Sequence, residues 1–195
     1  MALRLCDLHP IFMEGWWGMR YRRNYVEGGT YFFTVNFLER DKSLLVDHIA
    51  ELRESVSFVK RRRPFEIDAW VVLPNHMHAV WTLPQEDADY SSRWREIKKR
   101  FSTSMPKIER LSAVRKQKGE RGIWQRRFWE HTIIDEQDYR HHIDYVHFNR
   151  LKHGLVKQVK DWPFSSFHRA VRLGYYTEKW CSNEPLNTSD NGIGE

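Results

Sequence analysis

Cysteine is scarce in this sequence, and long apolar runs are absent. The 195 residues include two cysteines, Cys6 and Cys181, near opposite ends of the chain. Cysteines so placed make neither a disulfide framework nor a Cys-x-x-Cys metal motif, so we expect a reducing, cytoplasmic compartment. No run approaches the roughly 20 apolar residues of a membrane span, and the start MALRLCD lacks the features of a signal peptide. These absences predict no membrane partner.

Acidic residues are fewer than basic ones and are unevenly placed. The chain has 32 Lys and Arg against 26 Asp and Glu, and residues 182–195 contain acidic side chains but no Lys or Arg. The excess positive charge therefore lies in residues 1–181. A basic chain that is 14% aromatic is typical of nucleic-acid-binding proteins, although a protein without such a partner can share this composition. A hydrophobic content of 41% predicts a packed core and not global disorder.

The hydrophobic pattern predicts four strands and three main helices. The expected strands cover residues 30–38, 65–73, 76–83 and 123–134, and the expected helices begin at Ser43, at Ser91 or Ser92, and after Asp135. The last helix should run from about residue 136 to 152 and end at Gly154. The order β-α-β-β-α-β-α predicts an α+β protein with a ferredoxin-like split β-α-β fold, in which an antiparallel sheet gains an added C-terminal helix.

Two histidines flank Met77 at the start of the third expected strand. Because side chains alternate along a strand, His76 and His78 point to one face and Met77 to the other. Two imidazoles on one face can bind a metal ion. However, ten histidines in 195 residues produce this spacing by chance in about half of such chains. The pair therefore needs further partners before it indicates a site.

The last expected helix supplies such partners. Tyr145 and Asn149 are four residues apart and so share one helix face. A phenol can act as a nucleophile, and an amide oxygen suits Mg²⁺ or Mn²⁺. Tyr139 is a rival nucleophile that lacks an Asn or Gln four residues later. We interpret the remaining histidines of this region as mainly surface, DNA-facing or supporting groups: His141, His142, His147 and His153.

Several motifs stand in order along residues 21–167. They are Tyr21-Arg22-Arg23, residues 28–36, residues 73–78, residues 124–131, residues 144–149 and residues 152–156. Together they resemble the HUH single-tyrosine transposases, in particular the REP-associated tyrosine transposases. One departure is Arg150, where relatives often have proline, and it lies beyond Asn149.

This resemblance implies an HUH endonuclease fold and a metal-dependent enzyme that nicks and rejoins single-stranded DNA. Tyr145 would be the nucleophile, and His76, His78 and Asn149 would hold Mg²⁺ or Mn²⁺. Attack on a phosphodiester would leave a 5′-phosphotyrosine link and a 3′-OH, and the reverse reaction would join another 3′-OH without ATP. The alternative is a non-catalytic module that binds structured DNA or RNA on the same fold. A metal-dependent hydrolase is a weaker alternative.

The resemblance also implies a substrate, single-stranded DNA with REP-like hairpins. The side chains expected to contact this DNA are basic or aromatic: Tyr21, Arg22, Arg23, Arg95, Lys98, Lys99, Arg126, Arg127 and Lys152. Relatives include dimers that share the tyrosine helix and a branch expected to act as a monomer, so the resemblance leaves both a monomer and a homodimer open.

We expect the chain to have four parts. They are a DNA-contacting arm (residues 1–29), a catalytic domain (30–156), an extension that packs on this domain (157–181) and a disordered tail (182–195). Within the catalytic domain, the polar residues 105–122 are expected to form a surface loop or a short helix.

Overall fold

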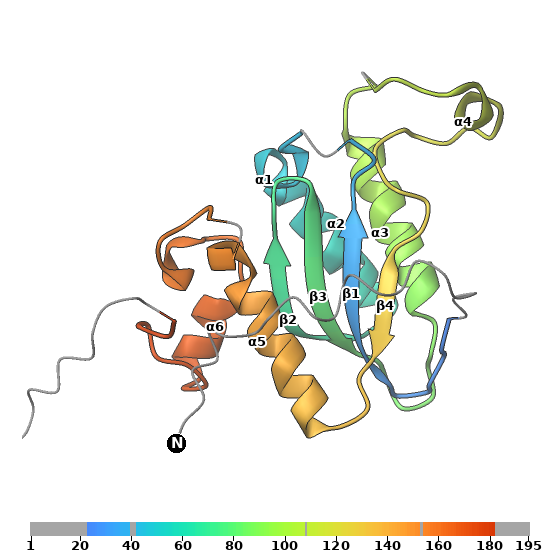
Figure 1. The fold of residues 1–195 in the computed structure, drawn as a ribbon. Coiled ribbons are helices and arrows are strands. Elements are labelled where there is room, and N and C mark those ends of the chain that lie inside the picture. The colour runs from blue at the N-terminus through green and yellow to red at the C-terminus, as the bar shows by residue number, and fades with distance from the viewer. Residues whose placement is uncertain (1–22, 40–41, 108, 153, 182–195) are drawn as a thin grey trace, which may run out of the picture.

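Figure 1 shows the fold of the computed structural model, which describes residues 23–39, 42–107, 109–152 and 154–181. Most of the expected arm, including Tyr21 and Arg22, lies outside the described residues, as does the expected tail. The side chain of Lys152 is also outside the description. In the described part, no helix is both long and apolar enough to cross a membrane.

Strands and helices follow one another in the expected order. The elements are β1 (Thr30–Asn36), α1 (Leu44–Asp47), α2 (Ile49–Arg62), β2 (Glu66–Val72), β3 (His76–Thr82), α3 (Tyr90–Ser104), α4 (Ala113–Gln117), β4 (Trp129–Thr132), α5 (Glu136–Lys152), the 3₁₀ turn η2 (Val159–Asp161) and α6 (Phe167–Arg172). The strands form one sheet in the order β2-β3-β1-β4, and all neighbours are antiparallel. Because β3 lies between β1 and β2, the arrangement is a split β-α-β unit and confirms the expected fold class.

The two faces of the sheet have different partners because side chains alternate along each strand. Phe33 and Trp81 point toward α2 and α3, and Trp81 stacks on Trp94 of α3 with ring centroids 4.0 Å apart. On the other face, Phe32 packs with Val146 of α5. Figure 1 shows α5 in front of the sheet, with α2 and α3 behind it. The face toward α5 is the one that can carry a site beneath a helix.

The fourth strand is shorter than expected. We predicted a strand over residues 123–134, but β4 covers only Trp129–Thr132. Trp124 forms an isolated bridge with Phe37, and the carbonyl of Gln125 accepts a hydrogen bond from Lys98 Nζ at 2.6 Å. Since that carbonyl bonds a side chain of α3, the strand pairing is interrupted before β4 begins.

The first expected helix is divided in two. We predicted one helix from Ser43, but His48 separates α1 from α2 with φ −117° and ψ 41°, outside the helical region. The N–H of Leu45 donates to the carbonyl of Pro74 at 3.1 Å. This bond ties α1 to the turn between β2 and β3, so α1 leaves the axis of α2.

The third helix begins one residue earlier than its expected caps. Asp89 is the N-cap of α3, and its carboxylate accepts the backbone N–H of Ser92 at 2.9 Å. We predicted Ser91 or Ser92 in this role, but both lie inside the first turn. The expected surface segment 105–122 contains the short helix α4 and has loop on either side.

The segment after α5 runs along the edge of β2. The indole of Trp162 donates to the carbonyl of Val72 at 2.9 Å, and the backbone N–H of Trp70 donates to Ser166 Oγ at 2.8 Å. Ser165 forms an isolated bridge with Val71. These bonds cover the backbone of an edge strand that would otherwise be available for pairing with another chain.

Asp135 stabilises the start of the helix that carries Tyr145. Its carboxylate accepts the backbone N–H of Asp138 at 2.8 Å, as predicted for an N-cap. Replacing Asp135 with alanine should lower the free energy of unfolding by about 1 kcal/mol, measured by urea denaturation. Gln137→Ala, at an exposed position of the same turn, should change it by less than about 0.5 kcal/mol. Equal effects of the two variants would contradict the capping role.

His147 makes stability depend on pH. Burial lowers its pKa from 6.5 to about 4, and its Nε2 lies 3.0 Å from Ser166 Oγ. The unfolded chain therefore binds a proton more readily than the folded chain, so stability is full above about pH 6.5 and falls as the pH drops toward 4. The loss should reach about 3 kcal/mol in urea unfolding across this range. His147→Gln should remove this component, whereas a matching change in the exposed His141 should leave it.

Candidate active site

His78 lies at the centre of the sheet face beneath α5. It is only 2% exposed, and its antiparallel neighbour on β1 is Thr34. Thr34 Oγ1 and His78 Nδ1 are 2.9 Å apart and share a hydrogen bond. A partner on Nδ1 fixes the orientation of the ring and turns Nε2 toward the region a metal ion would occupy.

His76 has an orienting partner of its own. Its Nδ1 lies 2.7 Å from Asn75 Oδ1 in the turn before β3. The rings of His76 and His78 are on the same face of β3, with centroids 5.1 Å apart. Both imidazoles are therefore held through Nδ1, the arrangement expected of histidines that bind a metal through the opposite nitrogen.

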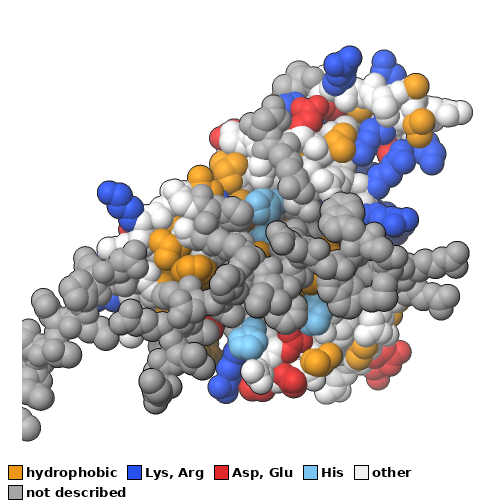
Figure 2. All heavy atoms as spheres, viewed as in Figure 1, with side chains coloured by type: hydrophobic (Ala, Val, Ile, Leu, Met, Phe, Trp, Pro, Cys, Tyr) orange, Lys and Arg blue, Asp and Glu red, His pale blue; other side chains and the backbone are white. Residues whose placement is uncertain are grey.

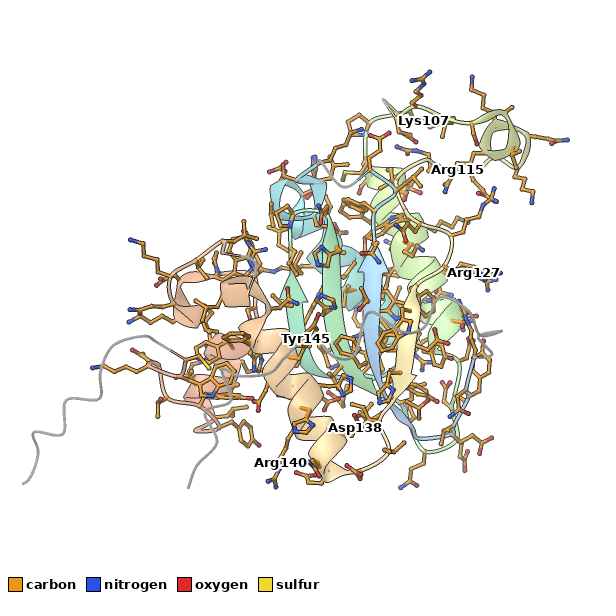
Figure 3. The ribbon with its side chains drawn as sticks, viewed as in Figure 1. Lys107, Arg115, Arg127, Asp138, Arg140 and Tyr145 are labelled. Atoms are coloured by element: carbon orange, nitrogen blue, oxygen red, sulfur yellow. The ribbon has the colours of Figure 1, made fainter. Side chains whose placement is uncertain are left out.

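Tyr145 lies in the middle of α5, where the helix crosses the sheet (Figure 3). Its ring centroid is 5.3 Å from that of His78 and 5.7 Å from that of Phe32, and both contacts are edge-to-face. The fold of a single chain thus brings together His78 and Tyr145, which are nearly seventy residues apart in the sequence. Burial raises the pKa of Tyr145, and the amide of Asn149 partly offsets this rise. The phenol therefore keeps its proton at neutral pH.

Asn149 follows Tyr145 by one helical turn and is fully buried. Its amide interacts with the phenol of Tyr145, and this contact is what offsets part of the rise in the pKa of that group. An amide offers two donor and two acceptor positions, which one phenol does not fill, so its oxygen can still accept a further partner such as a metal ion. Two imidazoles and one amide oxygen suit a divalent ion that keeps open positions for phosphate and water, so the residues His76, His78 and Asn149 fit the metal that the resemblance implies.

Tyr139 has a different environment. It packs among the same apolar side chains as Val146, but its phenol is hydrogen-bonded to Asp68 of β2. Burial and, after it, the nearby carboxylate of Asp68 together raise the pKa of Tyr139 to about 12. This phenol is therefore held by a carboxylate that opposes its ionisation. Tyr145 therefore remains the predicted nucleophile.

The histidines around the site differ in position. His141 is exposed, as we expected. His147 is only 2% exposed and packs on Phe167, with ring centroids 5.7 Å apart, so of our interpretations the surface and DNA-facing ones were wrong for it. The helix turns His147 toward the segment after α5 and away from the sheet centre. His153 lies outside the described residues, and His142 contacts the ring of Phe32 at a centroid distance of 4.8 Å.

The expected DNA-binding side chains do not form one patch around Tyr145. Arg95, Lys98 and Lys99 belong to α3, which lies on the opposite face of the sheet. Burial lowers the pKa of Lys98 to about 8, and its ammonium donates to a backbone carbonyl. Figure 2 shows lysine and arginine side chains gathered at the upper right of the molecule, toward α4.

The remaining arginines lie closer to β4. Arg23 packs over the ring of Phe128 at 4.5 Å and lies 3.7 Å from the carboxylate of Glu130. Arg126 is exposed and pairs with Glu120 at 2.8 Å. Arg127 is exposed and projects from the segment before β4, outside the sheet (Figure 3). These three side chains remain predicted DNA contacts.

Sequence reasoning missed the residues that orient the site. Thr34 lies in the strand expected over residues 30–38 and Asn75 lies between two expected strands, but we assigned neither of them a contact with a histidine. Aligning the apolar positions of the two strands could have found the register that pairs Thr34 with His78, because both are polar residues on a face that is otherwise apolar. Phe32, whose ring contacts those of His78 and Tyr145, was also missed.

A split β-α-β sheet with paired histidines on β3 and a tyrosine above them on α5 is the arrangement of the HUH endonucleases. No protein-family model matches the chain. It is 53% identical over 163 residues to the REP-associated tyrosine transposase of Escherichia coli (strain K12), covering 84% of this chain and 91% of that protein. It is also 45% identical over 167 residues to a putative REP-associated tyrosine transposase of Haemophilus influenzae, covering 85% and 95%.

A solved structure points to the same family as these two relatives. A REP-associated tyrosine transposase bound to a REP hairpin is 51% identical, with a TM-score of 0.72, and the match covers 91% of this chain and 97% of that one. The chain belongs to the family of REP-associated tyrosine transposases. It is thus a DNA-nicking and strand-joining enzyme of the tyrosine type.

Proposed function

We propose that this transposase cleaves single-stranded DNA beside REP-like hairpins, with Tyr145 as the nucleophile. The observation that carries the proposal is the contact between Tyr145 and His78 within one chain, at a ring-centroid distance of 5.3 Å. It is supported by the hairpin bound to the relative of known structure. The catalytic domain is residues 30–156, and residues 157–181 form its extension.

The chemistry follows from the phenol. The Tyr145 oxygen attacks the scissile phosphorus, its proton leaves, and the bond from phosphorus to the 3′ oxygen breaks. The products are a 5′-phosphotyrosine and a 3′-OH. Because the phosphotyrosine remains a phosphodiester, a second 3′-OH can attack it and release the phenol. This is strand transfer without hydrolysis or ATP.

We assign Mg²⁺ or Mn²⁺ to His76, His78 and Asn149. When bound, such an ion supplies Lewis-acid polarisation of the phosphate and neutralises part of its charge. The protein's own contribution is to hold the imidazoles through Thr34 and Asn75 and to place the phenol above them. Since the phenol is buried and protonated, catalysis also requires a proton acceptor near Tyr145.

We assign DNA contacts to side chains that flank this face. Arg23 and Arg127 are the described candidates nearest β4, and Tyr21, Arg22 and Lys152 extend the set along the chain. Arg95, Lys98, Lys99 and Arg126 would engage a hairpin that reaches the far side of the sheet. Because both halves of the site meet in one chain, we propose a monomeric active unit, in the cytoplasm, with a homodimer as the alternative.

The test is an adduct assay. The protein is incubated with a 5′- or 3′-labelled single-stranded oligonucleotide that carries a REP-like hairpin, with Mn²⁺ or with EDTA, and run on a denaturing gel. We expect a metal-dependent covalent adduct with the fragment 3′ of the cut and a free 3′-OH on the other fragment. Hairpin binding without cleavage would favour the non-catalytic module, and cleavage without an adduct would favour a hydrolase.

A further inference from the structure

Three metal-binding side chains meet away from the proposed catalytic metal. His131 lies on β4, and Asp138 and His142 lie one turn apart on α5. One ligand atom from each residue lies within 4.8 Å of the others. Among the described residues, these three form a group of His and Asp side chains close enough together to bind one metal ion.

The geometry is close to that of a ligand set. His131 Nε2 is 2.8 Å from Asp138 Oδ2, and His142 Nδ1 is 2.9 Å from Asp138 Oδ1. The two imidazole rings stack with centroids 4.7 Å apart and an interplanar angle of 19°. All three residues are partly buried. The side chains therefore converge from two elements and do not point separately into solvent.

The carboxylate of Asp138 is ionised and can therefore bind a cation. Asp138 is desolvated by burial, which raises its pKa, but the hydrogen bonds from His131 and from the N–H of Ile134 more than offset this and hold the pKa below its ordinary value. Asp138 thus stays ionised between two imidazoles. Two imidazoles and one carboxylate favour Zn²⁺ and neighbouring first-row ions over Mg²⁺.

This cluster is separate from the catalytic pair. The ring of Phe32 lies between them, 4.8 Å from that of His142 and 5.5 Å from that of His78. His142 precedes Tyr145 by three residues on α5. An ion at the cluster would consequently link β4 to the helix that positions the nucleophile, without touching the reacting phosphate.

We propose that His131, Asp138 and His142 form a second divalent-metal site, of the Zn²⁺ type, that fastens the start of α5 to β4. His142 Nδ1 also lies 2.9 Å from the carbonyl oxygen of Asp138. A metal ion at this nitrogen displaces the hydrogen shared there, and the neutral ring then carries its one hydrogen on Nε2. The site is structural, and its effect on Tyr145 is to restrain the helix.

The experiment counts metal ions in a chain without the catalytic pair. The full-length His76→Ala/His78→Ala variant is titrated with ZnCl₂ by calorimetry and with CoCl₂ by visible absorption. We expect one Zn²⁺ per chain, ligand-field bands of bound Co²⁺, and a melting temperature that rises by about 5–10 °C at a 100-fold excess of Zn²⁺ over its Kd.

Two added changes test the ligands. Asp138→Asn keeps an oxygen that can accept from Ile134 but loses the charged ligand, and should weaken binding by about 100-fold or more. His131→Gln should do the same, whereas His141→Ala, beside His142 but exposed, should bind as the parent does. Melting curves in EDTA show whether each variant folds.

The proposal is overturned if the His76→Ala/His78→Ala chain binds no stoichiometric Zn²⁺, or if folded Asp138→Asn and His131→Gln variants bind it unchanged. In either case the cluster is a hydrogen-bonded triad that needs no metal. The readout is metal binding and not DNA cleavage, so failure of the proposed nicking activity would leave this result standing.

Discussion

Replacing Tyr145 with phenylalanine should reduce DNA cleavage by at least about 10³-fold and abolish the covalent adduct. The substitution removes one oxygen and leaves a ring of the same shape. The edge-to-face contacts with His78 and Phe32 can therefore persist. Loss of activity in a folded variant would then report the missing nucleophile and not a collapsed site. The measurement is the denaturing-gel adduct assay with Mn²⁺.

Tyr139→Phe is the matched control for this prediction. Tyr139 lies on the same helix and is also partly buried, but its phenol is hydrogen-bonded to Asp68. We expect this variant to form the adduct at a rate within about tenfold of the parent, since no bond to the phosphate is lost. An adduct with Tyr145→Phe that disappears with Tyr139→Phe would transfer the nucleophilic role to Tyr139.

Replacing His78 with alanine should reduce cleavage by at least about 10³-fold in Mg²⁺ or Mn²⁺, because the metal ion loses a ligand and the phosphate loses its Lewis acid. His76→Ala should behave in the same way. Hairpin binding in EDTA, measured by gel shift, should change by less than about threefold, since neither side chain is assigned to hold the DNA by itself. Loss of cleavage with hairpin binding unchanged is the result expected if His76 and His78 bind the metal ion.

Thr34→Val provides a graded control. Valine has the shape of threonine, so it removes the 2.9 Å hydrogen bond to His78 Nδ1 and leaves the imidazole in place. Loss of such an orienting partner costs about 10–100-fold in metal affinity or activity. Raising the Mn²⁺ concentration should recover part of the rate. If His78→Ala cleaved as fast as Thr34→Val, His78 would not be a metal ligand.

The sequence was most informative where local signals agree. The last helix runs from Glu136 to Lys152, as predicted, because Asp135 caps its start and Gly154, with φ +65°, accepts the left-handed conformation after its end. The fold class followed from the order of strands and helices along the chain. β4 could not be delimited in this way, since Trp124 still bridges Phe37 but the carbonyl of Gln125 bonds to Lys98 of α3, which interrupts the pairing before Trp129.

The candidate site was predictable only as far as local periodicity places side chains on one face of a strand or helix. Strand alternation puts His76 and His78 on one face, and helical spacing puts Tyr145 and Asn149 on another, but neither rule says that the two faces meet. That contact depends on how α5 packs on β2 and β3. The spacing of Asp138 and His142 puts them on one face of α5, but it could not show that His131 of β4 joins them.

The burial of Met77 and the assembly of the active site depend on the same register of β3. It is fully buried against the α2 and α3 side of the sheet, while its two neighbours in sequence face α5. A slip of β3 by one residue would exchange these faces, placing imidazoles in an apolar core and a thioether under Tyr145. A misregistered chain would therefore be both unstable and inactive. Nicking activity in a sample thus reports the fraction of molecules that reached the native strand register.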